Sequence, residues 1–145
     1  MSADVRFEIV EHAGEAYLAA VRLRDDVLTN PMGMVTTPEE MAAEAPLTHV
    51  TGFNGSEVCA TCVLVRDGRA VRMKRVAVVE SAQSQGIGTA MLRFCEAFAS
   101  KQGADEIYAH ARQTAVRFYE KAGYVGEGDY FDEVGIPHLI VRKAL

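Results

Sequence analysis

The feature that most limits the fold of this chain is a strand that runs directly into a glycine-rich turn and an amphipathic helix. Residues 71–79 read VRMKRVAVV, residues 80–85 read ESAQSQ, and residues 86–92 read GIGTAML. The apolar positions that follow recur at helical spacing as far as Lys101, and Gly103 is a natural helix stop. A strand followed by a helix that packs against a sheet is typical of an α/β protein.

Two short turns upstream of this segment predict an antiparallel meander. Asn-Gly and Asp-Gly are favoured two-residue hairpin turns, and they occur here at residues 54–55 and 67–68. They separate three extended runs: His49–Phe53, Glu57–Val65 and Ala70–Val79. Two hairpins in succession are therefore expected before the glycine-rich turn.

The remaining elements complete a mixed sheet. The pattern predicts strands at Arg6–Val10, Glu106–Ala111, Val125–Phe131 and His138–Lys143, and helices at about Gly14–Leu28, from Thr37, and at Thr114–Ala122. Hairpins that lead into a strand-helix-strand-helix unit indicate an α/β (α+β) fold with a mixed, mostly antiparallel central sheet and helices on both faces. We expect one domain over residues 1–145.

Composition narrows the class of protein. A chain of 145 residues with 49% hydrophobic residues suits one globular core. A net charge of −5 argues against a nucleic-acid partner, which requires a basic face. The chain has no apolar run of the ~18 residues that a membrane span needs and no signal-like start, so we expect a soluble, cytoplasmic protein with no membrane contact.

The three cysteines do not predict a disulfide framework or a metal centre. Cys59 and Cys62 form a CxxC pair, but both lie in a predicted strand, where residues three apart face opposite sides. With Cys95 on the apolar face of a predicted helix, we expect three small buried thiols and no metal.

The glycine-rich turn can bind an anion. The spacing of Gln83, Gly86 and Gly88 directs backbone N–H groups outward at a helix N-terminus, where the helix dipole favours negative charge. A flexible strand-to-helix loop is the alternative. Two common nucleotide-binding motifs do not fit these residues. A P-loop needs a lysine after its last glycine, but Thr89 follows Gly88 here, and a dinucleotide fingerprint needs a small residue at the position of Met91.

On these residues the chain resembles the GCN5-related N-acetyltransferase (GNAT) superfamily, and a small bacterial branch of it. The superfamily signature is Gln/Arg-x-x-Gly-x-Gly/Ala between a central strand and a long helix, and residues 83–88 read QSQGIG. Residues 114–124, TAVRFYEKAGY, resemble the second motif of the family, with an alanine, a Phe-Tyr pair and a Gly-aromatic close. The likeness extends over nearly the whole chain.

The resemblance implies acetyl-CoA as co-substrate. Its pyrophosphate would bind the backbone amides of Gln85–Thr89, and its pantetheine arm would pair with the strand at Val76–Val78. The cofactor-binding residues implied in this way are Val76, Ala77, Val78, Gln83, Ser84, Gln85, Gly86, Ile87, Gly88, Thr89, Arg112 and Phe118. Arg112 departs from the asparagine of many members, and its cation could contact a phosphate.

The implied activity is direct transfer of the acetyl group to a primary amine in a ternary complex. Tyr119 would protonate the leaving thiolate, although its spacing on the predicted helix also suits core packing. Backbone N–H groups near Val76–Val78 would stabilise the oxyanion. Glu80 and His138 are the candidate bases, and either could instead be structural.

The acceptor is predicted only by class, as a small-molecule or peptide amine. Arg24 interrupts the apolar stripe of the first helix, so it could bind an anionic group of the acceptor or pair with an acid such as Asp26. A homodimer is possible through the terminal strands. The alternative function is a non-catalytic module of the same fold that binds acetyl-CoA as a sensor or structural ligand.

Overall fold

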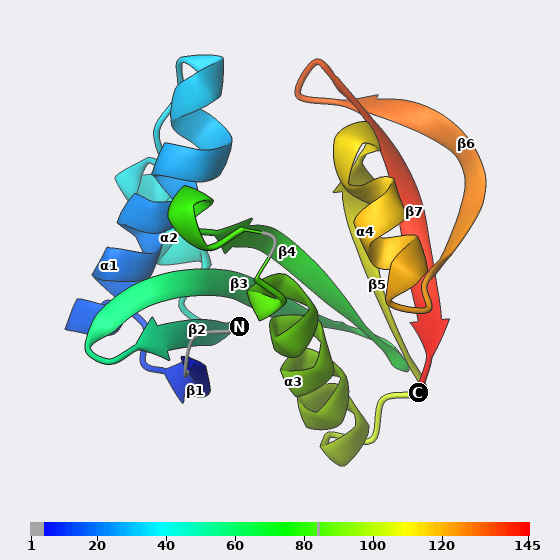
Figure 1. Cartoon of the computed structure of the whole chain (residues 1–145), viewed down its shortest axis with the longest axis horizontal. Helices are drawn as coiled ribbons and strands as arrows, with labels where there is room; N and C mark the ends of the chain where they lie inside the picture. Colours follow the sequence, from blue (N-terminus) through cyan, green and yellow to red (C-terminus); the bar gives the residue numbers. More distant parts are fainter. Residues whose placement is uncertain (1–4, 84) are drawn as a thin grey trace. The chain divides into compact units, whose positions relative to one another are not determined.

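The structure is a computed structural model that describes residues 5–83 and 85–145. The strands are β1 (Val5–Val10), β2 (Thr48–Asn54), β3 (Glu57–Asp67), β4 (Ala70–Val78), β5 (Glu106–Arg112), β6 (Val125–Glu133) and β7 (Ile136–Ala144). The α-helices are α1 (Glu15–Arg24), α2 (Pro38–Ala43), α3 (Ile87–Lys101) and α4 (Val116–Lys121). Figure 1 shows these elements in chain order.

The strands form a seven-stranded sheet in the order β1-β2-β3-β4-β5-β7-β6. The pairs β1–β2, β2–β3, β5–β7 and β6–β7 are antiparallel, and β4 and β5 pair in parallel over Ala70–Met73 and Glu106–Ala109. The predicted fold class, a mixed and mostly antiparallel sheet with flanking helices, is confirmed.

The chain divides into two compact units, and their boundary falls inside β4 and inside α3. The first unit contains the described residues up to 64 together with 75–94, and the second contains 65–74 and 95–145.

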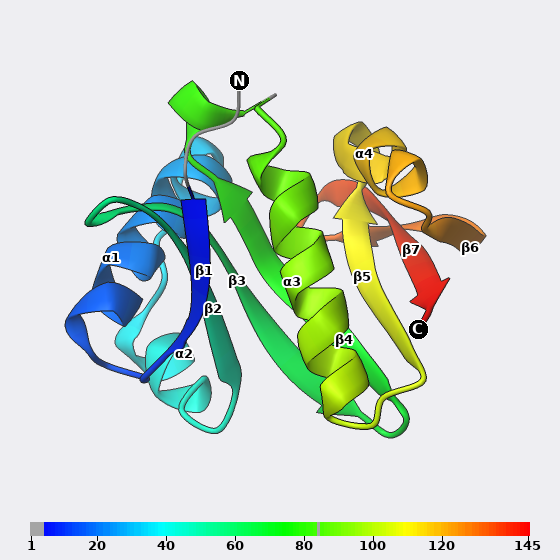
Figure 2. The same cartoon turned by 60° about the horizontal axis from the view of Figure 1, so that its bottom comes forward.

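In the first unit, helices pack on both faces of the β1–β2 pair. The Tyr17 ring of α1 meets the ring of His49 on β2 at 4.8 Å, and the Phe7 ring of β1 lies 5.9 Å from that of Phe94 on α3. Phe7 pairs with Gly52, where an added Cβ would come within 2.7 Å of the Phe7 ring. Glycine at position 52 therefore makes room for the aromatic contact with α3. Figure 2 shows β1, β2 and β3 side by side.

The turn that follows α1 is built around one carboxylate. A π-helical turn, Asp25–Thr29, continues α1, and Asp25 Oδ1 accepts hydrogen bonds from the Thr29 hydroxyl and from the backbone N–H and hydroxyl of Thr36. Burial acts to raise the pKa of Asp25, but these hydrogen bonds outweigh it and the pKa is lowered. The loop after α1 is thus tied to an ionised side chain.

The start of α2 agrees with the prediction from the sequence. Thr37 is the N-cap, its side chain accepts from Glu40 N, the Glu40 side chain accepts from Thr37 N, and Pro38 is the first helical residue. This is a capping box with a first-turn proline.

Arg24 has a different partner from the acid suggested by the sequence. Its Nη2 donates to both carboxylate oxygens of Glu44, at 2.8 and 2.9 Å, and not to the neighbouring Asp26. Tyr17 donates to the same carboxylate at 2.7 Å. Asp26 was the wrong suggestion because it follows Arg24 by only two residues, and positions that close do not face each other on a helix.

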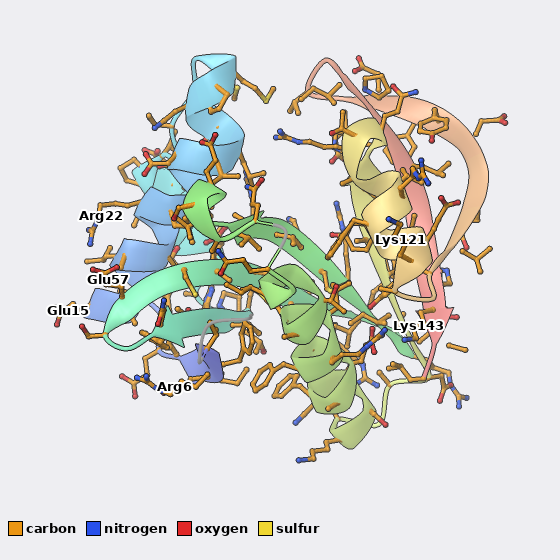
Figure 3. The ribbon with its side chains drawn as sticks, in the orientation of Figure 1. Arg6, Glu15, Arg22, Glu57, Lys121 and Lys143 are labelled. Atoms are coloured by element: carbon orange, nitrogen blue, oxygen red, sulfur yellow. The ribbon has the colours of Figure 1, made fainter. Side chains whose placement is uncertain are left out.

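In the second unit, α4 and the end of α3 cover one face of the strands. Tyr124 donates to Glu96 of α3, and Lys143 of β7, labelled in Figure 3, donates to Glu96 and to the carbonyl of Ala122. Leu139 and Val141, which share a face of β7 with Lys143, are buried. Helix α4 contacts β5, β6 and β7.

The last two strands extend further toward their connecting turn than the sequence predicted. They are joined at Val134-Gly135, and both residues have positive φ, 49° and 78°. Two left-handed residues in succession are typical of a type I′ hairpin turn, but a β-branched residue such as valine is unfavourable there. Cys59, Cys62 and Cys95 are all buried, as the sequence predicted.

Candidate functional site

The turn before α3 is held by two glutamine side chains that fold back on it. A short 3-10 turn, Glu80–Ala82, follows β4. Gln83 Nε2 donates to the carbonyl of Val78 at 3.0 Å, and Gln85 Nε2 donates to that of Ser81 at 3.3 Å. Both glutamines thus stabilise the loop that leads to the helix. Ser84, a predicted contact of the cofactor, lies outside the described residues.

Gly86 is the residue at which the chain turns into the helix. Its φ is +81°, a left-handed conformation that favours glycine, and an added Cβ would meet no atom within 4 Å. Gly86 is exposed. The space beside it is therefore open to a ligand, and glycine is required by the backbone conformation.

The first turn of α3 offers backbone donors. Ala90 N donates to Gly86 O at 3.0 Å, so the N–H groups of Ile87, Gly88 and Thr89 precede the first intrahelical bond. Ile87 is buried and anchors this end, while Thr89 is exposed. A 15-residue helix places the positive end of its dipole at the same point. This arrangement suits a phosphate or pyrophosphate.

The strand before the turn carries the predicted site for the pantetheine arm. Ala77 is buried, and Val76 and Val78 are half-buried. Arg75, within β4, has a φ of +55°, so the strand is irregular immediately before these residues. The carbonyl of Val78 already accepts the Gln83 amide, so one of its two lone pairs is occupied.

Tyr119 is buried on α4 in the second unit. Its ring lies edge-on to those of Phe118 and Tyr124, at 5.1 and 5.5 Å. Its carbonyl accepts the backbone N–H groups of Ala122 and Tyr124 and closes the helix. Aromatic packing and backbone bonds therefore fix the position of the phenol ring.

Tyr124 is a second buried tyrosine of the same aromatic group. Its hydroxyl donates to Glu96 at 2.8 Å, and burial, followed by that bond and the charge of Glu96, raises its pKa strongly. Tyr124 therefore stays protonated and is a structural side chain.

His138, one of the two predicted bases, is buried and engaged. Its Nδ1 donates to the carbonyl of Ile136 at 2.8 Å, and its Nε2 lies 3.6 Å from Glu133 Oε2. The other carboxylate oxygen of Glu133 lies 2.9 Å from Nδ1 of His110. In the β5–β7 ladder His138 pairs with Arg112, which is half-buried at the end of β5. Glu80, the other predicted base, is exposed on the 3-10 turn.

The predicted site residues therefore fall into two groups. The first unit brings together Val76, Ala77, Val78, Glu80, Gln83, Gln85, Gly86, Ile87, Gly88 and Thr89. The second unit holds Arg112, Phe118, Tyr119 and His138. Glu133 was not predicted from the sequence, because it comes beside His110 and His138 only through the pairing of β5, β7 and β6.

The described residues show neither a metal-binding group nor a membrane-spanning helix. No group of three or more His, Cys, Asp or Glu side chains in residues 5–83 and 85–145 is arranged to hold a metal ion. None of the helices in that part of the chain combines the length and the apolar character needed to cross a membrane.

Comparison with known proteins identifies similar chains. Residues 27–145 match the family model described as an acetyltransferase (GNAT) domain. A Bacillus subtilis protein named uncharacterized N-acetyltransferase YjcF is 29% identical over 127 residues, which cover 86% of this chain and 89% of that protein.

Two solved structures share the fold. An acyl-CoA N-acyltransferase from Pseudomonas aeruginosa superimposes with a TM-score of 0.79 at 21% identity, covering 97% of this chain and all of that one. A GNAT family acetyltransferase from Elizabethkingia anophelis with acetyl-CoA bound superimposes with a TM-score of 0.74 at 16% identity, covering 98% and 99%.

Proposed function

Because the chain belongs to the GNAT acetyltransferase family, we propose that it transfers the acetyl group of acetyl-CoA to a primary amine of a small molecule or peptide. The observation that carries this proposal is the turn at Gln83–Thr89, with a left-handed Gly86 at the start of α3. A related fold has been solved with acetyl-CoA bound, which supports the choice of donor. The cytoplasmic location and the possible homodimer stay predictions.

In this proposal, the first turn of α3 binds the pyrophosphate. The N–H groups of Ile87, Gly88 and Thr89 donate to its oxygens, and the open space beside Gly86 accommodates it. Backbone groups of Val76–Val78 pair with the pantetheine arm and donate to the carbonyl oxygen of the thioester, where negative charge develops. These roles depend on backbone geometry more than on side-chain identity.

The second unit supplies the acid. We assign the protonation of the departing thiolate to the Tyr119 hydroxyl, since a phenol with a reference pKa of about 10 can donate to a thiolate whose own pKa is roughly 8.5 by analogy with cysteine. Phe118 fixes the Tyr119 ring through its edge contact. Arg112 is assigned to a phosphate of the cofactor. Glu80 and His138 are the base candidates from the sequence.

The test is release of the CoA thiol from acetyl-CoA in the presence of pooled primary amines. Release that depends on both the protein and an amine supports the transferase. Tight binding of acetyl-CoA without release from any amine would contradict turnover and favour the non-catalytic binding module. Release only with hydroxyl or thiol acceptors would contradict the assignment to amines.

A further inference from the structure

Within the first unit, an ion pair joins the irregular point of β4 to helix α2. Arg75 Nη2 donates to Glu40 Oε2 at 3.2 Å, across 35 residues of the chain. Arg75 is the residue of β4 with the left-handed φ of +55°, and it immediately precedes Val76–Val78, the segment assigned to the thioester in the proposed function. The side chain of the irregular residue therefore has a defined partner.

The backbone conformation of Arg75 is unfavourable for an arginine. Left-handed φ values suit glycine and asparagine, and other residues keep them only where the surrounding structure requires it. The far end of the Val76–Val78 segment is fixed, because Val79 N donates to the Cys59 carbonyl of β3 at 2.8 Å and the Gln83 side chain donates to the carbonyl of the last residue. The direction of the N–H groups in this segment therefore depends on how the near end, Arg75, is held.

Glu40 is an ionised side chain with both oxygens engaged. Oε1 accepts from Thr37 N at 3.0 Å as part of the capping box, and Oε2 accepts from Arg75. The bond from Thr37 N is the main cause of its lowered pKa, and the Thr37 hydroxyl and Arg75 lower it further, while burial raises it by less. Glu40 thus offers Arg75 a negative charge near neutral pH.

Helix α2 is a fixed support for the side chains that it carries. It has only six residues, so its position depends on contacts with its neighbours. Before it, Thr36 donates its N–H and its hydroxyl to Asp25, and after it, Glu44 accepts from the buried Arg24. Both ends of α2 are therefore tied to the end of α1, and the two helices lie next to each other in both views (Figures 1 and 2).

The pair between Arg75 and Glu40 is partly exposed. The two side chains keep 30% and 45% of their surface accessible, so the pair contributes little to the stability of the whole protein. Its effect is local, because it acts on the one residue whose backbone conformation opposes its own preference. A weak interaction is sufficient to shift the balance between two conformations that differ little in free energy.

We propose that Arg75 and Glu40 are positioning residues for acetyl transfer, and that their ion pair holds the left-handed turn of β4 that directs the N–H groups of Val76–Val78 at the thioester carbonyl. This inference rests on the proposed function. Both residues act through the backbone and not by contact with the reacting atoms. Donors to the oxyanion act mainly in the transition state, whereas the pyrophosphate binds α3 in the same way throughout, so loss of the pair should lower kcat more than CoA affinity.

The experiment compares kcat, at saturating acetyl-CoA and amine, with the Kd of CoA measured by calorimetry. Glu40→Gln removes the charge but keeps the capping box, since glutamine also serves at that position. We expect kcat to fall about two- to fivefold, the range for a partly exposed ion pair, with less than about a twofold change in Kd.

Variants of Arg75 test whether the two residues act as one unit. Arg75→Gln should show the same loss of kcat as Glu40→Gln, and the variant with both substitutions should lose no more than either alone, because each change breaks the same pair. Arg75→Lys keeps a cation and should retain most of the wild-type kcat. A purely structural role would lower the melting temperature without this pattern in kcat.

The matched control is Glu39→Gln, which removes the same charge from the first turn of α2 at an exposed neighbouring position and should leave kcat and Kd unchanged. An unchanged kcat in Glu40→Gln would overturn the inference, and so would additive losses in the variant with both substitutions or an equal loss in Glu39→Gln. These outcomes leave the proposed function intact, because they require an active wild type. A wild type inactive with every amine would overturn the proposed function and the positioning role together.

Discussion

Glu44 accepts two hydrogen bonds from one nitrogen of Arg24, at 2.8 and 2.9 Å, and both side chains are almost completely buried. Arg24 ends α1 and Glu44 follows α2, so the pair joins the two helices of the first unit. Tyr17 donates to the same carboxylate, and burial, followed by this bond, raises the pKa of Tyr17 to about 12. The sequence left Arg24 open as an acceptor-binding residue, and this geometry gives it a structural partner.

Loss of one member of this pair should be strongly destabilising, because it leaves the other charge buried and unpaired. We expect Arg24→Met to lower the free energy of unfolding by about 3 kcal/mol, measured in urea, and Arg24→Met with Glu44→Leu to lose less than Arg24→Met alone. The control is Glu8→Gln, which breaks the exposed pair with Arg6 and should change stability by less than about 1 kcal/mol. An unchanged urea midpoint for Arg24→Met would contradict the role of the pair.

The buried His49 should make the stability of the protein depend on pH. Burial lowers the pKa of His49, and the charges of His12 and Arg24 lower it further. The hydrogen bond to the Glu44 carbonyl and the charge of Glu44 raise it by less, so the pKa is lowered overall. The unfolded chain then binds more protons at this site than the folded chain at pH values below about 6.5. Stability should therefore fall as the pH falls through that value, with a slope of at most about 1.4 kcal/mol per pH unit from this group.

The measurement is the free energy of unfolding in urea for the wild type and His49→Gln between about pH 7.5 and 5.5, the range in which histidine side chains titrate. Glutamine keeps a donor for the Glu44 carbonyl but does not titrate. The variant should show a shallower slope than the wild type, and equal slopes would mean that His49 does not contribute.

Glycine at position 86 can be required by its left-handed backbone conformation or by the close approach of the pyrophosphate, and two variants distinguish these reasons. Gly86→Val and Gly86→Asn both add a side chain to the open space beside the turn, but only asparagine tolerates the left-handed φ of +81° well. We expect both variants to bind CoA at least tenfold more weakly, about 1.4 kcal/mol, by calorimetry, and only the valine to lower the melting temperature. Gly55→Asn, at a φ of +64° in a hairpin turn that is also open, is the control and should keep its affinity. Full CoA affinity in Gly86→Asn would rule out close approach of the pyrophosphate.

Local chemistry explains what could be predicted from the sequence. Both hairpin turns form within one residue of the predicted positions, at residues 55–56 and 68–69 in place of 54–55 and 67–68, because Gly55 and Gly68 adopt the positive φ that such turns require. The capped start of α2 follows in the same way from Thr37 and Pro38. In each case residues close in sequence determine the structure.

Features that depend on distant partners were not predictable. Arg24 finds Glu44 twenty residues away, and His110 meets Glu133 only after β6 and β7 have paired. The positive φ of Arg75 opposes its own preference, and no residue beside it signals that conformation. Pairing across strands and tertiary packing override local propensity at these positions.

Tyr119→Phe tests the acid directly. The variant keeps the ring and its contacts with Phe118 and Tyr124 but removes the hydroxyl. Proton transfer by a positioned group typically contributes ~10²- to 10⁴-fold, so we expect kcat to fall at least tenfold while CoA affinity and melting temperature stay nearly unchanged. The assay should run at a saturating acceptor concentration, because a weakened amine site would otherwise resemble slow chemistry.

Tyr124→Phe is the matched control for this prediction. It removes a buried hydroxyl from the same aromatic group, but that hydroxyl donates to Glu96, so its loss leaves a carboxylate with one partner fewer. We expect it to lower stability by about 1–3 kcal/mol with little change in kcat, the reverse of the pattern for Tyr119→Phe. If Tyr119→Phe instead follows the pattern of Tyr124→Phe, Tyr119 is a packing residue and the thiolate takes its proton from water or another group.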